Sequence, residues 1–439
     1  MSVIVFIPGI MGCRLSLKGE EIWPPTLTEA IGGYKRVDKL MDPKARAVGV
    51  IEKVECFAFY GPILQNLNDI GSGACGAPKR AVVPFHYDWR KDLRLAAGEL
   101  AQTLDALAAD HAEIILVAHS MGGLLARWYL EAGGFEARPG WGKVARLITI
   151  ATPHAGAPIA LVRAMGLEAT VGLSGGDTAR LAASPDFPAL YQLLPAKQDV
   201  FAWQRVQGGS PALNIYDPAV AKELGLGEAN LAAAQAFRAG LDEARRPDHV
   251  RYHVVGASGH ATATRVDIGT GNPRIAREIA AGDGAVPLWS AVLAQEPHEV
   301  TKGEHRKVLV ERDFQAILYR LFDAAPVVAP MSDDGAQTAI SVSVDRLTYR
   351  PGEDVEVLLL AARPREAADF RILLSGPGDG PSTQAGKLTW EGQALAEFQL
   401  TLSAPDQPGQ YSLSVRGATH RSVSDETDVA VFVVEGDLA

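Results

Sequence analysis

Ser120 is the residue whose surroundings most clearly point to chemistry, because it stands between an apolar run and a helix-like segment. The run Ile114–Ala118 is typical of a buried strand, and Met121–Leu130 has apolar residues at helical spacing. A serine on a sharp turn from strand to helix exposes its Oγ above the sheet, where it can attack a carbonyl carbon. The backbone N–H of Met121 would lie beside the oxyanion that forms. The pattern therefore predicts a nucleophile for acyl transfer at Ser120.

A serine hydroxyl is a weak nucleophile unless a base takes its proton and an acid orients that base. In chains with this strand–turn–helix, the order along the sequence is serine, then acid, then histidine. Asp283 lies downstream between two glycines, and His305 lies in a loop before the predicted final helix, Asp313–Phe322. We therefore expect Asp283 to orient His305, and His305 to take the proton of Ser120.

Other residues compete for these two roles. His298 is the main alternative for the base, and Asp248 and Asp267 are the alternatives for the acid. Neither of these aspartates has a glycine on each side. The remaining histidines are less favoured because they lie too early in the chain, lie within a predicted strand, or, as His119 does, stand next to the serine.

The loop after the first predicted strand should supply a second donor to the oxyanion. The segment Pro8–Gly12 contains two glycines that would let the backbone approach a substrate oxygen. We predict the N–H of Ile10 as this donor, a contribution worth about 10²–10³ in rate. Met11 is the next choice and is predicted to contact the substrate. Trp23, on the segment after this loop, is predicted to contact lipid.

The first part of the chain alternates strand-like with helix-like segments, which favours a parallel sheet covered on both faces. The predicted strands are Val3–Ile7, Ala81–Pro84, Ile114–Ala118, Leu147–Ala151 and Val250–Gly256. The predicted helices are Leu93–Leu107, Met121–Leu130, Asn230–Ala239 and Asp313–Phe322. Together with the serine turn, this order predicts an α/β class protein with the α/β-hydrolase fold over residues 1–323. The segment of about 158–248 is too long for a loop and is predicted to form a cap or lid.

Composition changes at Ala324, where a stretch rich in Ala, Pro and Asp begins. Residues 324–338 are predicted to be a linker. After it, short runs alternate apolar and polar residues between turns; Tyr411, Leu413 and Val415 are one such run. Residues 339–439 are therefore predicted to form an all-β, immunoglobulin-like sandwich.

The chain of 439 residues is too long for one ordinary core, which indicates two or more domains. Its net charge of −10 argues against nucleic acid as a partner and against attachment to membranes by a basic patch. Any transient contact with a membrane surface would be mainly apolar and would involve the lid. The sequence does not indicate which partner the C-terminal sandwich binds.

Three cysteines, Cys13, Cys56 and Cys75, fit no zinc-binding spacing and are expected to be reduced thiols. No stretch approaches the roughly 20 apolar residues of a membrane span. Val3–Ile7 is interrupted at once by Pro8-Gly9, which is not typical of a signal peptide. We therefore expect a cytoplasmic protein as encoded, with export by a signal-independent route left open.

The segment Gly71–Gly76 has the spelling of a dinucleotide-binding loop, G-x-G-x-x-G. It follows a helix-like segment and precedes a strand, which is the reverse of the order such a loop requires. We predict no cofactor and no metal site.

At the residues named above, and at several further motifs, the sequence resembles the lecithin:cholesterol acyltransferase family, which includes lysosomal phospholipase A2. The matching pieces are Ile7–Leu15, Ile22–Pro25, Tyr87–Arg90, Ala118–Gly123, Ala151–Gly156, Tyr191–Pro195 and Gly282–Pro287, followed by His305. The resemblance implies that Ser120, Asp283 and His305 form a triad, with Ile10 and Met121 in the oxyanion hole. It also implies lipid esters as substrates and an acyl-enzyme. The disulfide that holds the lid in secreted members has only weak candidates here, Cys56 and Cys75.

These observations predict a serine esterase of the lipase or phospholipase type. The alternatives are an O-acyltransferase that moves an acyl group from a phospholipid to an alcohol, and a toxin-like or other interaction protein that uses its β-sandwich. The motif Tyr87–Arg90 is interpreted as a buried Asp–Arg pair with an aromatic wedge that holds a loop, rather than as a substrate contact.

Overall fold

The computed structural model divides the chain into two compact units. The residues that it describes are 2–26, 29, 33–54, 57–73, 75–170, 172–196, 201–204, 211–269, 273–324, 340–344, 348–376, 382–417 and 429–434. The first unit contains Met1–Leu27, Tyr34–Ala169 and Leu173–Val327; the second contains Val328–Ala439 with the short segments Thr28–Gly33 and Thr170–Gly172. Each unit is described by itself below. Of the predicted linker at 324–338, only Ala324 lies within the described residues.

A sheet of six parallel strands forms the centre of the first unit, in the order β15-β12-β9-β8-β1-β7. The strands are β1 (Ser2–Ile7), β7 (Arg80–Pro84), β8 (Glu113–His119), β9 (Val144–Ile150), β12 (Arg251–Ser258) and β15 (His298–Lys302). All of these strands except β15 confirm the strands that the apolar runs predicted. In the register between β1 and β8, Ile7 pairs with Ala118. The loop that follows β1 therefore begins beside the turn at Ser120.

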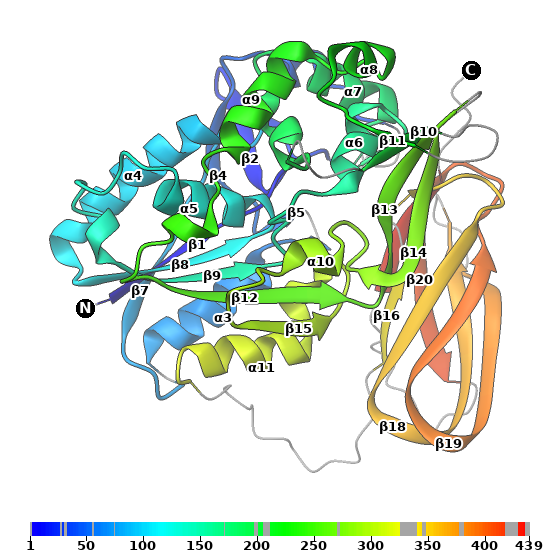
Figure 1. Ribbon diagram of the computed structural model, residues 1–439. Helices are drawn as coiled ribbons and strands as arrows, with labels where there is room; N and C mark the ends of the chain where they lie inside the picture. The colour runs from blue at the N-terminus through cyan, green and yellow to red at the C-terminus, as the bar shows by residue number, and fades with distance from the viewer. Residues whose placement is uncertain are drawn as a thin grey trace. The chain divides into compact units, whose positions relative to one another are not determined.

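Helices cover both faces of this sheet, as Figure 1 shows. On one face lie α4 (Leu93–Asp110) and α5 (Met121–Glu131), and on the other lie α3 (Gly61–Ser72) and α11 (Arg312–Leu321). The buried side chains of α3 and α11 share one hydrophobic cluster with residues of the strands, including Phe6 and Ile115. This three-layer arrangement confirms the predicted α/β-hydrolase fold class.

The edge strand β15 was not predicted, because its sequence His-Glu-Val-Thr-Lys has no apolar run. Only Thr301 of its five residues is buried. A strand at the edge of a sheet has a neighbouring strand on one side only and is more exposed than a central strand, so polar residues suffice there.

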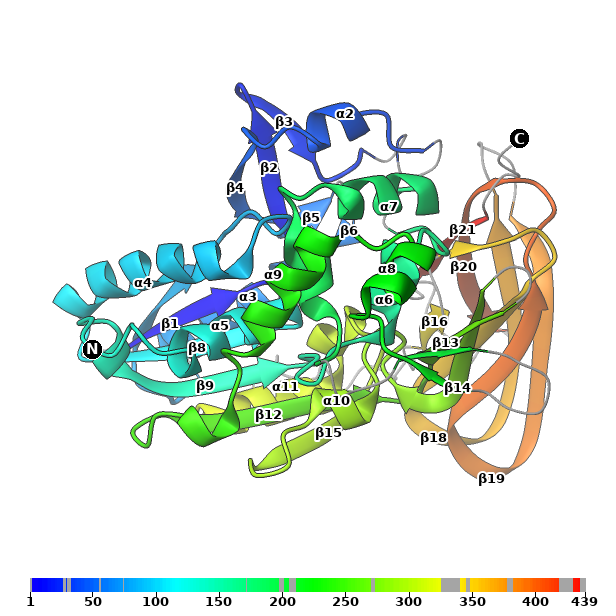
Figure 2. The ribbon, with the colours of Figure 1, turned by 45° about the horizontal axis from the view of Figure 1, so that its top comes forward.

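Between β9 and β12 the chain forms a separate group of helices. These are α6 (Pro158–Ala164), α7 (Gly175–Ala183), the 3-10 helix η2 (Pro188–Leu193), α8 (Pro218–Glu223) and α9 (Glu228–Arg238). In Figure 2 they lie on the side of the sheet where α5 lies, toward the carboxyl ends of its strands. The buried Gln192 of η2 accepts from the N–H of Leu93 over 2.8 Å and donates to Asp92 over 2.6 Å. Gln192 therefore ties this group of helices to the start of α4.

A small four-stranded sheet joins this group of helices to the segment after β12, in the order β11-β10-β13-β14. Its strands are β10 (Ala202–Gln204), β11 (Ala212–Leu213), β13 (His260–Ile268) and β14 (Arg274–Gly282). The hairpin of β13 and β14 was not predicted. We call the α6–α9 helices and this small sheet the cap; it extends beyond the range 158–248 expected from the sequence.

The segment after β1 folds as a small three-stranded sheet in the order β3-β2-β4, seen at the top of Figure 2. Its strands are β2 (Cys13–Leu17), β3 (Glu20–Trp23) and β4 (Arg46–Val50), and the short helix α2 (Val37–Leu40) precedes β4. The two-residue strands β5 (Lys53–Val54) and β6 (Phe57–Ala58) lead into α3. This sheet begins directly after the glycines of the first loop, so it helps to position them.

The second unit is an all-β sandwich, as predicted, and its strands pair antiparallel except for β17 and β21, which pair in parallel. Its strands are β16 (Ile340–Val344), β17 (Thr348–Tyr349), β18 (Asp354–Ser375), β19 (Thr383–Ser403), β20 (Gly409–Gly417) and β21 (Val429–Val434). The long strand β18 pairs with β16 near its start and with β20 near its end. The alternating residues Tyr411, Leu413 and Val415 are all buried in its core.

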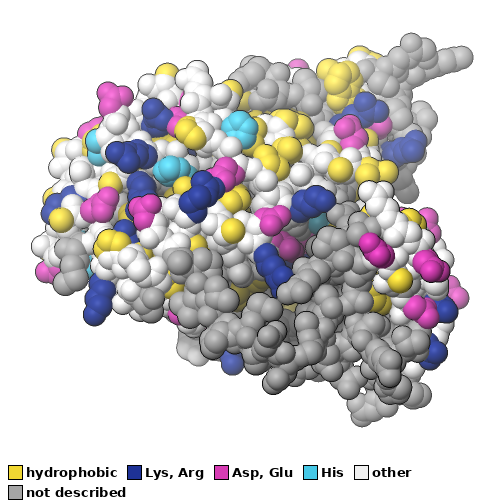
Figure 3. Space-filling view, turned by 90° about the horizontal axis from the view of Figure 1, so that it is seen from below, with side chains coloured by type: hydrophobic (Ala, Val, Ile, Leu, Met, Phe, Trp, Pro, Cys, Tyr) yellow, Lys and Arg dark blue, Asp and Glu magenta, His cyan; other side chains and the backbone are white. Residues whose placement is uncertain are grey.

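Charged side chains of both signs are interspersed on the face shown in Figure 3, with hydrophobic side chains among them. The described residues of this face therefore form no continuous basic surface. Within the described part of the chain, no helix has the length and hydropathy that a membrane crossing requires.

Candidate active site

Ser120 occupies the sharp turn that the sequence predicted, between the last residue of β8 and the first of α5. Its φ of 55° and ψ of −126° lie outside the regions that most residues adopt. Such a conformation costs on the order of 1–3 kcal/mol and persists only where the surroundings impose it. Here the N–H of Ser120 donates to the carbonyl of Ile150 over 2.8 Å.

The turn needs small residues because backbone and side chains approach it closely. A Cβ on Gly122 would lie 2.5 Å from the carbonyl oxygen of Ile7, and one on Gly123 would lie 2.0 Å from Oγ1 of Thr152. A Cβ on Gly9 would lie 2.8 Å from Cβ of Ser120. The glycines of the two motifs therefore let β1, β8 and α5 meet around the hydroxyl.

The structure brings Ser120, His305 and Asp283 together in one hydrogen-bonded chain. Nε2 of His305 lies 2.8 Å from Oγ of Ser120, and Nδ1 lies 2.7 Å from Oδ2 of Asp283. An ionised carboxylate only accepts hydrogen bonds, so Nδ1 of His305 carries the proton and Nε2 is free to accept from the serine. This is the tautomer that a general base needs.

Asp283 is held rigidly in a fully buried position. Its Oδ1 accepts hydrogen bonds from the N–H groups of Ala285 and Val286, at 3.0 and 2.7 Å. Its own carbonyl accepts from the N–H of His305 over 2.8 Å. The acid therefore orients both the imidazole and the backbone of His305.

The acid does not follow a strand of the central sheet directly, because the hairpin β13–β14 intervenes. The base of that hairpin closes where His260 pairs with Gly282 and, through an isolated bridge, with Asp283. Since His260 comes two residues after the end of β12, the chain returns to the carboxyl edge of the central sheet. Asp283 thus lies at the sheet edge despite the insertion.

The alternative residues lie elsewhere. His298 is exposed at the start of the edge strand β15, opposite Val254 of β12. Asp248 is exposed in the turn before β12. Asp267 lies in β13 and forms an ion pair with Arg265 over 3.1 Å.

His119 has a part in the site that sequence reasoning missed. Its Nε2 lies 2.9 Å from the backbone carbonyl of His305, and its Nδ1 lies 2.9 Å from the hydroxyl of Tyr60. A carbonyl only accepts, so Nε2 of His119 carries the proton and Nδ1 accepts from Tyr60. The Tyr60 oxygen in turn accepts from the N–H of Gly9 over 2.9 Å. This chain joins the loop after β1 to the loop of His305.

Burial keeps both members of this chain uncharged. Desolvation, followed by repulsion from His305, lowers the pKa of His119 to about 3. Desolvation also raises the pKa of Tyr60 above its usual value. His119 is therefore neutral and Tyr60 protonated across the physiological range, as their hydrogen bonds require.

The loop after β1 forms a tight turn over Gly9–Gly12, in which the N–H of Gly12 donates to the carbonyl of Gly9 over 3.1 Å. Met11 has a φ of 63°, a position that usually requires glycine in such a turn. The N–H of Ile10 donates to none of the described residues. Met121 is the first residue of α5, so its N–H has no acceptor within the helix. Both predicted oxyanion donors are thus free to bind a substrate oxygen.

Four buried aromatic side chains hold this turn through hydrogen bonds. Tyr60 binds Gly9 as described, and the hydroxyl of Tyr87 donates to the carbonyl of Pro8 over 2.8 Å. The indoles of Trp23 and Trp89 donate to the carbonyls of Met11 and Cys13, over 2.9 and 3.2 Å respectively. No feature of the sequence pattern indicated these bonds, since each aromatic residue lies far from the turn in the chain.

Trp23 therefore has a different place from the one predicted. Its side chain is fully buried and contacts Trp89, with a centroid separation of 5.1 Å. Full burial does not favour contact with lipid. The hydrogen bond to Met11 favours a positioning role for Trp23 instead.

The interpretation of Tyr87–Arg90 as a structural motif is confirmed. Arg90 forms two hydrogen bonds with Asp88, at 2.9 and 2.7 Å, and is buried. Its remaining donors bind carbonyl groups of Leu40, Asp42 and Ala45.

A narrow cavity of about 20 Å³ lies between this turn and the cap. It is lined by Ile10 and Met11 of the turn, by apolar residues of α7, η2 and their connection, and by the arginines of positions 90 and 163. Its lining is mostly apolar and includes Met11, whose predicted contact with the substrate stays a prediction. A cavity of this size holds about one water molecule, so a larger ligand requires the cap side chains to move.

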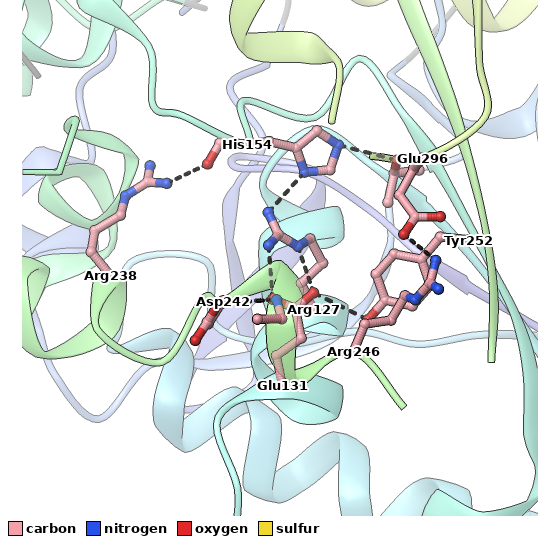
Figure 4. A network of polar contacts seen from close by, with 10 residues as sticks. Arg127, Glu131, His154, Arg238, Asp242, Arg246, Tyr252 and Glu296 are labelled. Atoms are coloured by element: carbon pink, nitrogen blue, oxygen red, sulfur yellow. Dashed lines mark hydrogen bonds and ion pairs between the residues drawn. The ribbon is translucent and has the colours of Figure 1, made fainter. Parts of the chain in front are cut away.

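A buried polar network beneath the cap is shown in Figure 4. Arg127 and Glu131 of α5 form two parallel hydrogen bonds of 2.7 Å, and neither side chain is more than 3% exposed. Glu131 also accepts from the hydroxyl of Tyr252 over 3.1 Å and from the N–H of Asp242 over 2.9 Å. The network thus joins α5, β12 and the segment that follows α9.

The same network reaches the cap through His154. Nη1 of Arg127 lies 3.3 Å from Nδ1 of His154, and burial, with the charge of Arg127, holds the pKa of His154 well below its usual value. Arg238 of α9 donates to the carbonyls of His154 and Leu194, both over 2.8 Å. These contacts fix one end of α9 to the core behind the candidate site.

Cys13 and Cys75 are buried free thiols, and Cys56 lies outside the described residues. Burial raises the pKa of the Cys13 thiol to about 12, so it is not a reactive thiolate. Within the described residues, no group of histidine, cysteine or carboxylate side chains could hold a metal ion.

Comparison with solved structures finds similar chains, with low TM-scores and low sequence identities. Phospholipase PlaB from Legionella pneumophila is 11% identical with a TM-score of 0.28, over 99% of this chain and 90% of that chain. A gene product of Listeria innocua is 10% identical with a TM-score of 0.30, over 73% of this chain and 92% of that chain. The reeler domain of human F-spondin is 19% identical with a TM-score of 0.19, over 22% of this chain and 88% of that chain. Likenesses of this degree say nothing about activity.

Sequence comparison is more informative. None of the curated proteins matches the chain. The family model for lecithin:cholesterol acyltransferase matches residues 33–230, a range that includes the turn at Ser120, the segment of Tyr60 and most of the cap. This match covers less than half of the chain, and over residues 33–230 the chain is therefore similar to the lecithin:cholesterol acyltransferase family.

Proposed function

We propose that this chain is a serine esterase of the lipase or phospholipase type that cleaves lipid acyl esters through an acyl-enzyme. One observation carries the proposal: the hydroxyl of Ser120 on its sharp turn lies 2.8 Å from Nε2 of His305, whose Nδ1 lies 2.7 Å from the buried carboxylate of Asp283. This is the arrangement by which a serine becomes a nucleophile.

In the first half of the reaction, Oγ of Ser120 forms a bond to the ester carbonyl carbon while its proton passes to Nε2 of His305. The N–H groups of Ile10 and Met121 bind the oxyanion. The bond from carbon to the alkoxy oxygen then breaks, and His305 gives its proton to that oxygen. Asp283 remains ionised and stabilises the imidazolium.

In the second half, His305 takes a proton from water, the water oxygen attacks the acyl carbon, and the bond to Ser120 Oγ breaks. The free acid leaves and the serine regains its proton. The chemistry uses only groups of the chain, water and the ester.

Lipid esters are the favoured substrate class for two reasons. The matching family acts on lipids, and the cavity beside the oxyanion turn is mostly apolar. Because that cavity is narrow, an acyl chain enters only when the cap shifts. Contact with a membrane or micelle surface through the cap would favour this shift.

Matched serine and histidine variants test the proposal. Ser120→Ala and His305→Ala should each lower hydrolysis of p-nitrophenyl butyrate by at least about 10³-fold, as removal of triad members does. His298→Ala is the control and should keep full turnover. A fluorophosphonate should label Ser120 in the wild type, as located by mass spectrometry of peptides. Wild-type turnover in folded Ser120→Ala protein would overturn the assignment.

Transfer to an alcohol is the second candidate, because the matching family is named for an acyltransferase. The same acyl-enzyme serves both reactions, and only the acceptor differs. Products from a phospholipid with a labelled acyl chain, with and without a lipid alcohol, would distinguish free acid from a new ester. If the wild type neither reacts with fluorophosphonate nor hydrolyses any ester, a binding function of the second unit becomes the better hypothesis.

A further inference from the structure

The short turn that carries Asp283 is held by a side chain from outside it as well as by its own hydrogen bonds. The carboxylate of Asp283 accepts from the N–H groups of Ala285 and Val286, at 3.0 and 2.7 Å. The N–H of Gly284, directly after the acid, donates to Oγ1 of Thr262 over 2.9 Å. Gly284 has a φ of 90°, a left-handed conformation that favours glycine. The orientation of the carboxylate therefore depends on how this turn is held.

Thr262 is suited to hold the turn because both of its hydrogen-bonding directions are fixed. The residue lies in β13 and is fully buried. Its hydroxyl donates to the carbonyl of His260 over 2.9 Å. Since that bond uses the hydroxyl proton, the oxygen faces Gly284 as an acceptor, and the two bonds strengthen each other. Thr262 thus sets the distance between β13 and the turn of the acid.

The strand β13 that carries Thr262 also pairs with the cap helices' own segment. Further along β13, Val266 pairs in parallel with Ala202 of β10, and its N–H donates to the carbonyl of Phe201 over 2.7 Å. β10 lies between η2 and α8 in the chain. Figure 1 shows β13 and β14 running together from the end of β12 toward β10 and β11. A displacement of the cap is therefore transmitted along β13 to the turn of the acid.

A second hydrogen-bonded tie connects the segment after the turn to the core. The short helix α10 (Leu288–Ala291) begins directly after the turn. The Oγ of its Ser290 donates to the carbonyl of Gly156 over 2.5 Å and accepts from the N–H of Ala155 over 3.2 Å. These two residues lie in the loop after β9 of the central sheet. Of the two ties, the one at Thr262 leads to a strand of the cap.

We propose that Thr262 is a positioning residue of the active site, whose hydroxyl holds the turn of Asp283 and thereby the imidazole of His305. This inference rests on the proposed esterase function and adds that the cap takes part in the geometry of the acid. Asp283 transmits the position, because its Oδ2 lies 2.7 Å from Nδ1 of His305 and its carbonyl accepts from the N–H of His305 over 2.8 Å. A small displacement of a reacting group is enough to lower the rate strongly.

Matched valine and serine variants test the proposal by kinetics. Thr262→Val keeps the shape of the side chain but leaves the N–H of Gly284 without an acceptor. We expect kcat for p-nitrophenyl butyrate to fall about 10- to 100-fold, with KM changed less than about twofold. Thr262→Ser keeps the hydroxyl and should retain kcat within about threefold.

The control is Thr264→Val on the same strand. The hydroxyl of Thr264 donates to Glu278 over 3.0 Å in an exposed hydrogen bond, away from the turn of the acid. This variant should keep the kcat of the wild type. Equal kcat in Thr262→Val and Thr264→Val would overturn the proposal, and so would equal losses in Thr262→Val and Thr262→Ser.

Proton NMR gives a readout that does not depend on turnover. The Nδ1 proton of His305, bound to a buried carboxylate, should give a resonance at low field that His305→Ala lacks. Thr262→Val should shift this resonance upfield or broaden it, whereas Thr262→Ser and Thr264→Val should leave it in place. An unchanged resonance in Thr262→Val would contradict the proposal.

Two further measurements separate other causes of failure. Thermal unfolding of each variant ensures that kinetics are compared well below its melting temperature. If Thr262→Val does not fold, Thr262→Ala takes its place; failure of both to fold would show a merely structural role and overturn the proposal. Fluorophosphonate labelling of Ser120 tests the esterase function itself. Without labelling of the wild type that function fails, while the low-field resonance still shows whether Thr262 positions the acid.

Discussion

The imidazole of His119 donates to the backbone carbonyl of His305 over 2.9 Å, so the residue before the nucleophile holds the loop of the base. Through Tyr60, the same imidazole is connected to the N–H of Gly9 in the oxyanion turn. The nucleophile, the base and the oxyanion turn thus share one buried set of hydrogen bonds. Small shifts in any of its members would change the geometry of the reacting groups.

Removal of the Tyr60 hydroxyl should impair both stability and catalysis. Tyr60→Phe leaves the N–H of Gly9 and Nδ1 of His119 without partners, at a cost of about 1–3 kcal/mol. We expect kcat for p-nitrophenyl butyrate to fall about 10- to 100-fold, with KM little changed, because loss of geometry affects the transition state. Tyr129→Phe is the control, because the Tyr129 hydroxyl is buried without a partner among the described residues. Equal kinetics in the two variants would contradict a positioning role.

The free energy of unfolding should decrease as the pH is lowered, because of the buried histidines. The pKa of His119 is about 3 in the folded state, against 6.5 for an ordinary histidine. Between these two values the unfolded chain binds a proton at this residue and the folded chain does not. The contribution is present above about pH 6.5 and is lost as the pH falls toward 3, by about 1.4 kcal/mol per pH unit. The pKa of His154 is lowered in the same direction. Urea unfolding between pH 7 and 4 should show a shallower decline for His119→Gln than for the wild type.

Gly122 should tolerate no side chain. A Cβ there meets the backbone oxygens of Ile7 and Pro8 at 2.5 and 2.6 Å, so Gly122→Ala must push α5 away from β1. We expect a loss of about 1–3 kcal/mol in stability and a large loss of esterase activity. Gly98→Ala on α4, where nothing lies within 4 Å of the added Cβ, should instead stabilise the protein by about 0.5–1 kcal/mol. Thermal unfolding of both variants gives the comparison.

The buried pair of Arg127 and Glu131 should be costly to break. Glu131→Gln leaves the guanidinium buried without its charge partner, and we expect a loss of about 3–5 kcal/mol in unfolding free energy. Asp38→Asn breaks the exposed pair with Arg180 and should cost less than about 1 kcal/mol. Similar denaturant midpoints for the two variants would show that the network does not anchor the cap.

The sequence alone indicated the groups that are proposed to do chemistry, because local patterns specify them. An apolar run before Ser120 and glycines after it require a strand, a sharp turn and a helix, whatever lies around them. The positions of Asp283 and His305 followed from chain order in this fold and not from any contact. The alternating residues of the second unit likewise predicted its strands, since burial on one face repeats every second residue.

Tertiary structure decided what surrounds those groups. The edge strand β15 and the hairpin β13–β14 have no long apolar runs, so no periodic pattern marked them. Trp23, expected at a lipid surface, is the last residue of β3 and is buried against Trp89, far from it in the chain.

The roles of His119 and Tyr60 depend on contacts between residues that lie 51 to 186 positions apart in the chain. Hydrogen bonds of this kind have no sequence period, because each depends on where two distant elements happen to pack. The sequence therefore determined which residues could react, and the packing of the cap, the turn over Gly9–Gly12 and the loop of His305 decided how these residues are held.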